Sequence, residues 1–139
     1  MPDVRRFGVS MEANLLRAFD RLIRRKGYRN RSEAIRDIIR DQLVRTEWEA
    51  PDEEVMGAVT LVYDHEAGHL PEALTDLQHR HHDAIVCSTH VHMDAHNCLE
   101  SIVVRGTSKL VRAIADQLLS TKGVKHGGLV STSTGKRLP

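Results

Sequence analysis

The sequence has little of what would place the chain outside a reducing, aqueous compartment. Its 139 residues include two cysteines, too few for a disulfide framework, so a reducing compartment is expected. No apolar run approaches the ~20 residues that cross a bilayer, and the basic residues 1–10 lack the apolar segment of a secretory signal. Aromatic residues are scarce, whereas charged residues are plentiful. We therefore expect a compact cytoplasmic protein with no membrane partner.

The formal net charge of +1 conceals an asymmetry between the two ends of the chain. Residues 1–48 contain twelve Lys and Arg against seven Asp and Glu, a balance of +5. Residues 49–139 contain eight against twelve, a balance of −4. A basic N-terminal part joined to an acidic part indicates different partners for the two parts.

The first 45 residues have the pattern of one strand and two helices. Within residues 4–10, three small or charged residues alternate with Phe7 and Val9, which predicts a half-buried strand. A helix ending at Gly27 is expected next, because apolar residues recur at helical spacing: Leu15, Leu16, Phe19, Leu22 and Ile23. The second helix is predicted to begin after Asn30, and its apolar positions are Ala34, Ile35, Ile38, Ile39 and Leu43.

Such a unit is too small to be stable alone, because its strand has no partner and its core is small. Two copies that pair their strands antiparallel would solve both problems. Residues 4–45, including the turn from Gly27 to Arg36, resemble the ribbon-helix-helix family of DNA-binding proteins. The resemblance implies a dimeric module that binds double-stranded operator DNA.

The ribbon and the start of the second helix hold the candidate DNA contacts. Arg6 is expected to read a base edge, because a two-stranded ribbon fits the major groove and arginine donates two hydrogen bonds to guanine. Ser10 is a lesser candidate, and Gly8 stands where the family usually has a hydroxyl residue facing the DNA. Backbone N–H groups at the start of the second helix are expected to bind phosphate; the residues there are Asn30, Arg31 and Ser32.

Residues 49–54, which include Pro51, are predicted to form a short acidic linker. Beyond it the pattern predicts strands at residues 55–63, 84–92, 98–105 and 124–130, and helices at 71–82 and 108–120. This βαββαβ order predicts a ferredoxin-like (ACT-like) domain over residues 55–131, and an α+β fold overall. The polar, basic residues 132–139 are expected to be disordered.

Eight of the nine histidines lie within residues 65–96. His90 and His92 are two apart in a predicted strand, so they project from the same face. If a five-residue hairpin loop follows, His92 lies opposite Cys98 and His90 lies opposite Glu100. Imidazole and thiolate are ligands of borderline transition metals. We therefore predict a metal site at His90, His92 and Cys98, with Glu100 orienting an imidazole.

His79 is the best candidate for a fourth ligand, but it is not expected to come from the same chain. It precedes the strand whose far end carries His90 and His92, and eight strand residues put ~25 Å between those ends. A neighbouring subunit could supply its own His79, so the site is predicted to link metal binding with assembly. Cys87 has the opposite parity from His90 and is expected to pack in the core as a small apolar side chain.

Together, the DNA-binding module and the metal hairpin resemble the nickel-responsive transcriptional regulator family (NikR). The resemblance covers nearly the whole chain and includes the segments 78–79, 90–92, 98–100 and 123–127. It implies one Ni²⁺ per subunit in a nearly square-planar site, with His79 donated across the interface of a homotetramer, a dimer of dimers. Arg80 departs from the family pattern because it interrupts the histidine run.

The resemblance also implies a second cation at Glu33 and Asp37, where the two domains meet in the DNA complex. The sequence thus predicts a nickel-sensing transcriptional regulator, most simply a repressor. Two alternatives stay open. One is a ribbon-helix-helix repressor that needs no metal, and the other is a metalloenzyme in which three protein ligands leave a position for water.

Overall fold

The computed structural model of the chain describes residues 3–139. Two compact units divide between Ile39 and Arg40, inside the helix α2, which spans Arg31–Glu49. The sequence predicts the division at a linker over residues 49–54 instead. The difference arises because the last turns of α2 belong to the second unit, where Val44 and Trp48 pack in its core. Residues 50–53 separate α2 from the first strand.

The first unit contains the first helix and the first turns of α2, joined by a tight turn. Helix α1 spans Ala13–Arg25 and is followed closely by Gly27. The backbone of Gly27 has a φ of 83°, a conformation that glycine adopts without the steric strain that other residues meet there. The Asn30 side chain accepts a hydrogen bond from the Glu33 N–H at 2.9 Å, so Asn30 caps α2 as the sequence predicts. Residues 3–12 form neither helix nor strand in the single chain. The expected strand at residues 4–10 therefore stays a prediction that depends on a second copy.

The first unit leaves much of its apolar surface uncovered. Ile23 and Ala34 are buried, but several large apolar side chains are not: Phe7, Val9, Leu15, Leu22, Ile38 and Ile39. These six exposed residues are half of the twelve that the sequence assigns to the apolar faces of the strand and helices. An uncovered apolar surface of this kind marks an association surface.

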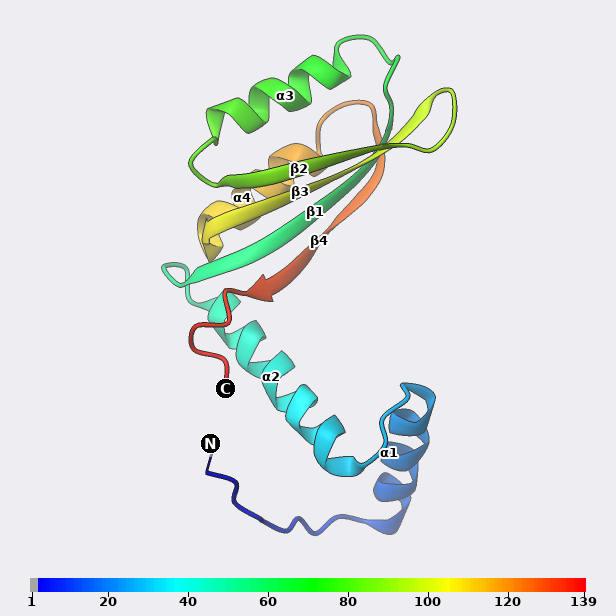
Figure 1. Ribbon diagram of the computed structural model, residues 1–139, viewed down its shortest axis with the longest axis vertical. Helices are drawn as coiled ribbons and strands as arrows, with labels where there is room; N and C mark the ends of the chain where they lie inside the picture. Colours follow the sequence, from blue (N-terminus) through cyan, green and yellow to red (C-terminus); the bar gives the residue numbers. More distant parts are fainter. Residues whose placement is uncertain (1–2) are drawn as a thin grey trace. The chain divides into compact units, whose positions relative to one another are not determined.

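The second unit has the βαββαβ order that the sequence predicts. Its elements are β1 Glu54–Asp64, α3 Leu70–Arg80, β2 Ile85–His92, β3 Asn97–Thr107, α4 Ser108–Leu119 and β4 Val124–Ser133. The strands form one antiparallel sheet in the order β2-β3-β1-β4 (Figure 1). The α+β fold with a ferredoxin-like domain is thereby confirmed.

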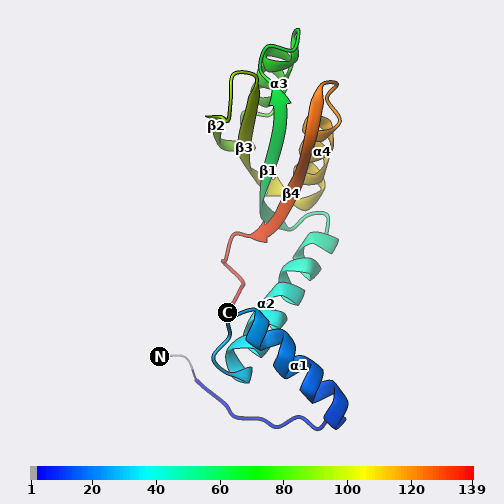
Figure 2. The ribbon, with the colours of Figure 1, turned by 90° about the vertical axis from the view of Figure 1, so that its right-hand side faces the viewer.

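Both helices of this domain, α3 and α4, lie on the same face of the sheet (Figure 2). Side chains on β1 alternate between buried and partly exposed, as expected when one face is covered. The core between sheet and helices contains Leu61, Tyr63, Leu74, Ile102, Ile114 and Leu118. The opposite face of the sheet is open, and Val91 and Val130 are exposed on it.

The end of α2 is anchored in the second unit by Trp48. This side chain is 4% exposed and its Nε1–H donates to the Thr132 carbonyl at 2.9 Å. The Arg112 guanidinium lies over the indole ring, 5.1 Å from its centre, a cation–π contact.

The C-terminal residues follow a defined path, although the sequence predicts that residues 132–139 are disordered. Strand β4 extends to Ser133. Arg137 then donates to the Glu53 carboxylate at 2.9 Å, and Arg40 donates to the Pro139 carbonyl at 2.8 Å. These charged partners lie outside the tail, so composition alone does not reveal them. No helix within residues 3–139 is long and apolar enough to cross a membrane.

Candidate metal centre

The hairpin of β2 and β3 has the register that the sequence predicts. His90 pairs with Glu100 and His92 pairs with Cys98. Residues 93–96 form the loop, where the Asp94 carboxylate accepts the N–H groups of His96 (2.8 Å) and Asn97 (2.7 Å). Hydrogen bonds from the Asn97 side chain and from these two N–H groups hold the pKa of Asp94 well below its usual range. The loop geometry is thus fixed by its own side chains.

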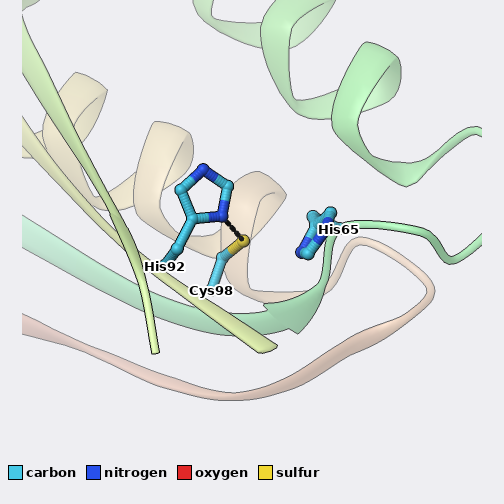
Figure 3. Close-up of side chains that lie close together, drawn as sticks. All are labelled: His65, His92 and Cys98. Atoms are coloured by element: carbon cyan, nitrogen blue, oxygen red, sulfur yellow. Dashed lines mark hydrogen bonds between the residues drawn. The ribbon is translucent and has the colours of Figure 1, made fainter. Parts of the chain in front are cut away.

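Three ligand-type side chains gather at this end of the domain (Figure 3). The ligand atoms of His65, His92 and Cys98 all lie within 4.8 Å of one another. The Cys98 Sγ is 3.7 Å from the His92 Nδ1, and the rings of His65 and His92 meet edge to face with centroids 5.2 Å apart. A thiolate with two imidazoles suits nickel, copper or zinc. The residues present therefore fit a transition-metal ion.

The electrostatic setting of Cys98 favours a thiol until a metal is bound. The residue is fully buried, and burial raises the pKa of the Cys98 thiol, although the backbone N–H of His65 acts in the opposite direction. A metal ion would deprotonate such a thiol, because a coordinating sulfur binds as thiolate. The His65 Nδ1 is also buried, and it has no hydrogen-bond partner among the described residues.

His90 lies beside this cluster. Its ring centroid is 5.1 Å from that of His92 and 5.9 Å from that of Tyr63, which it meets edge to face. The His90 side chain is exposed on the edge strand β2. The structure therefore brings the predicted ligands His90, His92 and Cys98 to one face of one hairpin.

Glu100 is the centre of a buried hydrogen-bond network beneath the hairpin. Its Oε2 accepts from the Tyr63 hydroxyl at 2.7 Å, and its Oε1 accepts from Gln78 Nε2 (3.0 Å) and Ser88 Oγ (2.7 Å). Burial alone would raise the pKa of Glu100, but these three hydrogen bonds outweigh it and the pKa is lowered.

The sequence predicts that Glu100 orients an imidazole directly. Among the described residues its hydrogen bonds go instead to Tyr63, Gln78 and Ser88. Tyr63 in turn packs against the His90 ring. Tyr63 therefore contacts both Glu100 and His90, a link that a reading of the hairpin alone could not reveal.

His79 does not belong to the cluster of His65, His92 and Cys98 in its own chain. The strand length that the sequence analysis gives as the reason is not the whole explanation. The side chain of Gln78, its neighbour on α3, reaches Glu100, which pairs opposite His90. The separation expected from strand length alone thus overstates the distance, because α3 lies over the sheet. His79 follows Gln78 on the helix, and its side chain is exposed.

The structure adds one ligand-type residue that the sequence does not single out and corrects the place of one cysteine. His65 follows Asp64, and Asp64 pairs with Asn97 beside the hairpin loop. Only this non-local register reveals it. Cys87 is exposed, so its predicted place in the core is wrong. The helices cover the face that carries His90 and Cys98, which leaves Cys87 on the open face.

Among the residues predicted to contact DNA, Arg31 already makes side-chain hydrogen bonds within the first unit. Arg6, Gly8, Ser10, Arg31 and Ser32 are exposed. The Arg31 guanidinium donates two hydrogen bonds of 2.9 Å to Asp20 on α1, which raises the pKa of Arg31. Its side chain is therefore held by protein, while the helix start stays accessible.

The candidate second cation site has one carboxylate already engaged. Asp37 accepts from the Tyr28 hydroxyl at 2.7 Å. This hydrogen bond raises the pKa of Tyr28, with burial a lesser cause. Glu33 is partly exposed one turn earlier on α2.

Comparison with solved structures supports the fold of part of the chain. An uncharacterized protein from Thermotoga maritima, TM1266, superimposes with a TM-score of 0.51 at 15% identity, over 57% of this chain and 98% of that chain. At this identity the likeness concerns the fold alone.

Comparison of sequences goes further. Residues 5–46 match the profile of the ribbon-helix-helix protein, copG family, and residues 56–132 match that of the NikR C terminal nickel binding domain. Several relatives are named "Putative nickel-responsive regulator". One from Geobacter sulfurreducens is 57% identical over 138 residues, and the match covers 99% of both chains. One from Pyrococcus horikoshii is 59% identical over 133 residues, covering 96% of both chains.

A ribbon-helix-helix module joined to a thiolate–imidazole hairpin defines a metal-responsive regulator of transcription. The profile matches and the near full-length relatives place the protein more narrowly. The chain belongs to the NikR family of nickel-responsive regulators. Because this family consists of transcriptional regulators, the metalloenzyme alternative is set aside.

Proposed function

We propose that the protein represses transcription when one Ni²⁺ per subunit binds at His90, His92 and Cys98, with His79 of the partner subunit as the fourth ligand. The observation that carries the proposal is the hairpin register, which pairs His92 with Cys98 and puts His90 on the same face. The exposure of His79 supports donation to another chain. Nickel would supply a fixed charge and a cross-link between subunits.

The proposed assembly is a homotetramer built from two kinds of contact. The exposed apolar residues of the first unit, such as Leu22 and Ile38, support a ribbon-helix-helix dimer. The open face of the sheet, with Val91 and Val130 exposed, supports packing of the second unit against another copy. An ion held by ligands from two subunits would favour the assembled state, and this preference is what a regulatory ligand requires.

The proposed DNA contacts follow from the exposed N-terminal segment and the capped helix. Arg6 would read a base edge, with Gly8 and Ser10 beside it, and the N–H groups at Asn30, Arg31 and Ser32 would bind phosphate. A second cation at Glu33 and Asp37 would form part of the DNA-bound state. A repressor of this kind acts on the chromosome, so we place it in the cytoplasm.

One alternative ligand set deserves a direct test, since His65 lies within 4.8 Å of His92 and Cys98 in the single chain. A site of His65, His92 and Cys98 would need no second subunit. Nickel titrations of His79→Ala, His90→Ala and His65→Ala distinguish the two sets. The shared site requires that the first two variants lose tight binding and that His65→Ala keeps it. The reverse result would refute the shared site.

Regulation is tested by DNA binding at fixed salt. Genomic fragments are first selected with the nickel-loaded protein, and their affinity is then measured with nickel, copper, zinc or a chelator. The proposal expects tight binding only with metal, and loss of that response in Cys98→Ala. Equal affinity with nickel and with chelator would support a metal-independent repressor instead. Run-off transcription from a selected promoter, with and without nickel, tests whether the effect is repression.

A further inference from the structure

The segment between α2 and β1, residues 50–53, is bonded to the second unit through its backbone, and we call it the connection. Ser108, the buried first residue of α4, donates from its Oγ to the Ala50 carbonyl at 2.7 Å. The Ser108 N–H donates to the Glu53 carbonyl at 2.9 Å. The start of α4 therefore satisfies two carbonyl groups of the connection and fixes its path.

The C-terminal residues hold the same region through its acidic side chains. Arg137 donates from Nη1 to the Glu53 carboxylate at 2.9 Å, and Lys136 Nζ lies 3.8 Å from the carboxylate of Glu54, the next residue. Arg105 on β3 also donates to Glu54. The hydrogen bond from Arg105 and, to a lesser degree, the charge of Lys136 hold the pKa of Glu54 below its usual range. These side chains form a network of charges, which stabilises more than an isolated exposed pair does.

The path of residues 134–139 is fixed by a turn and by a contact at its end. After β4, which ends beside the C-terminal end of α2 (Figure 1), Gly135 has a φ of 80°, a conformation that favours glycine. The Gly135 N–H donates to Ser133 Oγ at 3.0 Å, and the Leu138 N–H donates to the Gly135 carbonyl at 3.3 Å. Arg40 on α2 then donates to the Pro139 carbonyl at 2.8 Å. A terminal segment tied down in this way is ordered.

From these contacts we propose that residues 134–139 form a strap that stabilises the connection and the last turns of α2 on the second unit, and that the strap strengthens the response of DNA binding to metal. The second part rests on the proposed function. Helix α2 carries predicted phosphate contacts at its start and the anchored Trp48 near its end. Loosening the anchored end should therefore weaken the coupling between metal and DNA.

The strap is tested by amide hydrogen exchange of the full-length protein without metal. The Glu53 N–H donates to the Ala50 carbonyl at 3.2 Å, so its exchange requires the connection to open. Arg137→Gln should speed exchange in the connection about 1.5- to 5-fold, the range typical of an exposed ion pair. Combined with Lys136→Gln, the increase should reach at least about threefold. Gly135→Ala leaves both charges in place but strains the turn, and it should also speed exchange.

The chain offers a matched control for the loss of one positive charge. Arg45 pairs with Asp41 on α2 at 3.2 Å and is 70% exposed, against 76% for Arg137. Arg45→Gln should leave exchange in the connection unchanged. A charge exchange gives a second control: Arg137→Glu and Glu53→Arg should each speed exchange, and the two together should restore much of the protection.

The consequence for regulation is measured as the ratio of DNA affinity with nickel to that with a chelator, at fixed salt on one selected genomic fragment. This ratio should fall about threefold when Arg137→Gln and Lys136→Gln are combined, in step with the loosened connection. Arg45→Gln should keep the wild-type ratio, and the charge exchange between Arg137 and Glu53 should restore it.

The strap is overturned if the combined variant exchanges at the wild-type rate in the connection, or if Arg45→Gln speeds exchange equally. Its role in regulation is overturned if exchange speeds while the affinity ratio stays at the wild-type value. Failure of the proposed function is distinguishable from both results. A wild-type protein whose DNA affinity ignores nickel would refute that function, whereas the exchange experiment uses no metal and tests the strap by itself.

Discussion

The Tyr63 hydroxyl donates a hydrogen bond of 2.7 Å to the buried Glu100 carboxylate, and the same tyrosine ring packs edge to face against His90. This relationship joins the strand β1 to the metal hairpin through side chains of the core. Tyr63 is one of three donors to this buried charge, with Gln78 and Ser88, and such hydrogen bonds are the condition under which a buried carboxylate is tolerated.

Glu100→Gln should weaken both the fold and the metal site. The substituted amide presents N–H donors on one side, so at least one of these hydrogen bonds must reverse or be lost, and the negative charge that strengthens all three is removed. The expected loss is about 1–3 kcal/mol in the free energy of unfolding, with nickel affinity reduced about 10–100-fold because His90 is less well held. Urea unfolding and nickel titration measure the two effects. Glu72→Gln, an exposed helix substitution, is the control and should change neither.

The same carboxylate predicts a pH dependence of stability. The pKa of Glu100 is lowered in the folded protein, so its contribution is complete above the ordinary glutamate pKa of about 4.3. The contribution is lost as the pH falls through that value towards the folded-state pKa. Urea midpoints measured without metal between about pH 3 and 6 should fall on acidification, and Glu100→Gln should flatten the curve. A wild-type curve that rises on acidification in this range would contradict the assignment.

Trp48→Ala should be among the most damaging substitutions in the second unit. It removes a buried aromatic side chain, a hydrogen bond to Thr132 and the stacking surface of Arg112. Truncation of a buried aromatic residue typically costs about 3–5 kcal/mol. Trp48→Phe keeps most of the apolar contact and should cost less. If both variants unfold at the same urea concentration as wild type, Trp48 does not anchor α2.

Asp20→Asn should change DNA binding without touching a predicted DNA contact. Asp20 holds the Arg31 guanidinium through two hydrogen bonds, so its neutralisation releases a positive charge at the start of α2. Affinity for non-specific DNA should rise, and the dependence of log affinity on log salt should steepen by about one per released charge. Asp3→Asn, which neutralises the exposed partner of Arg5, controls for net charge. Equal effects of the two variants would exclude a specific role for Asp20.

The sequence predicts those features that depend on local periodicity. Parity along β2 and a short loop were enough to pair His92 with Cys98, and capping chemistry was enough to place Asn30 before α2. Features that depend on non-local packing were missed. The place of His65 depends on the pairing of Asp64 with Asn97, and the exposure of Cys87 depends on which face of the sheet the helices cover.

The linker that the sequence predicts at residues 49–54 illustrates the same dependence on non-local packing. The acidic residues after Trp48 resemble a linker in composition, yet Trp48 itself is buried against β4 and the tail returns to Glu53. The composition of a segment gives its own polarity. It cannot identify a contact with a residue far along the chain, such as that between Trp48 and Thr132, which are 84 residues apart in the sequence.

The pairing of β2 with β3 limits how the hairpin loop can vary in evolution or in engineering. Side chains alternate between the two faces of a strand, so inserting one residue before Cys98 would either force a bulge or turn Cys98 and Glu100 together to the open face. Two inserted residues would preserve the face. Loops between His92 and Cys98 that still hold metal should therefore differ in length by even numbers, and a library of loop lengths would show that alternation.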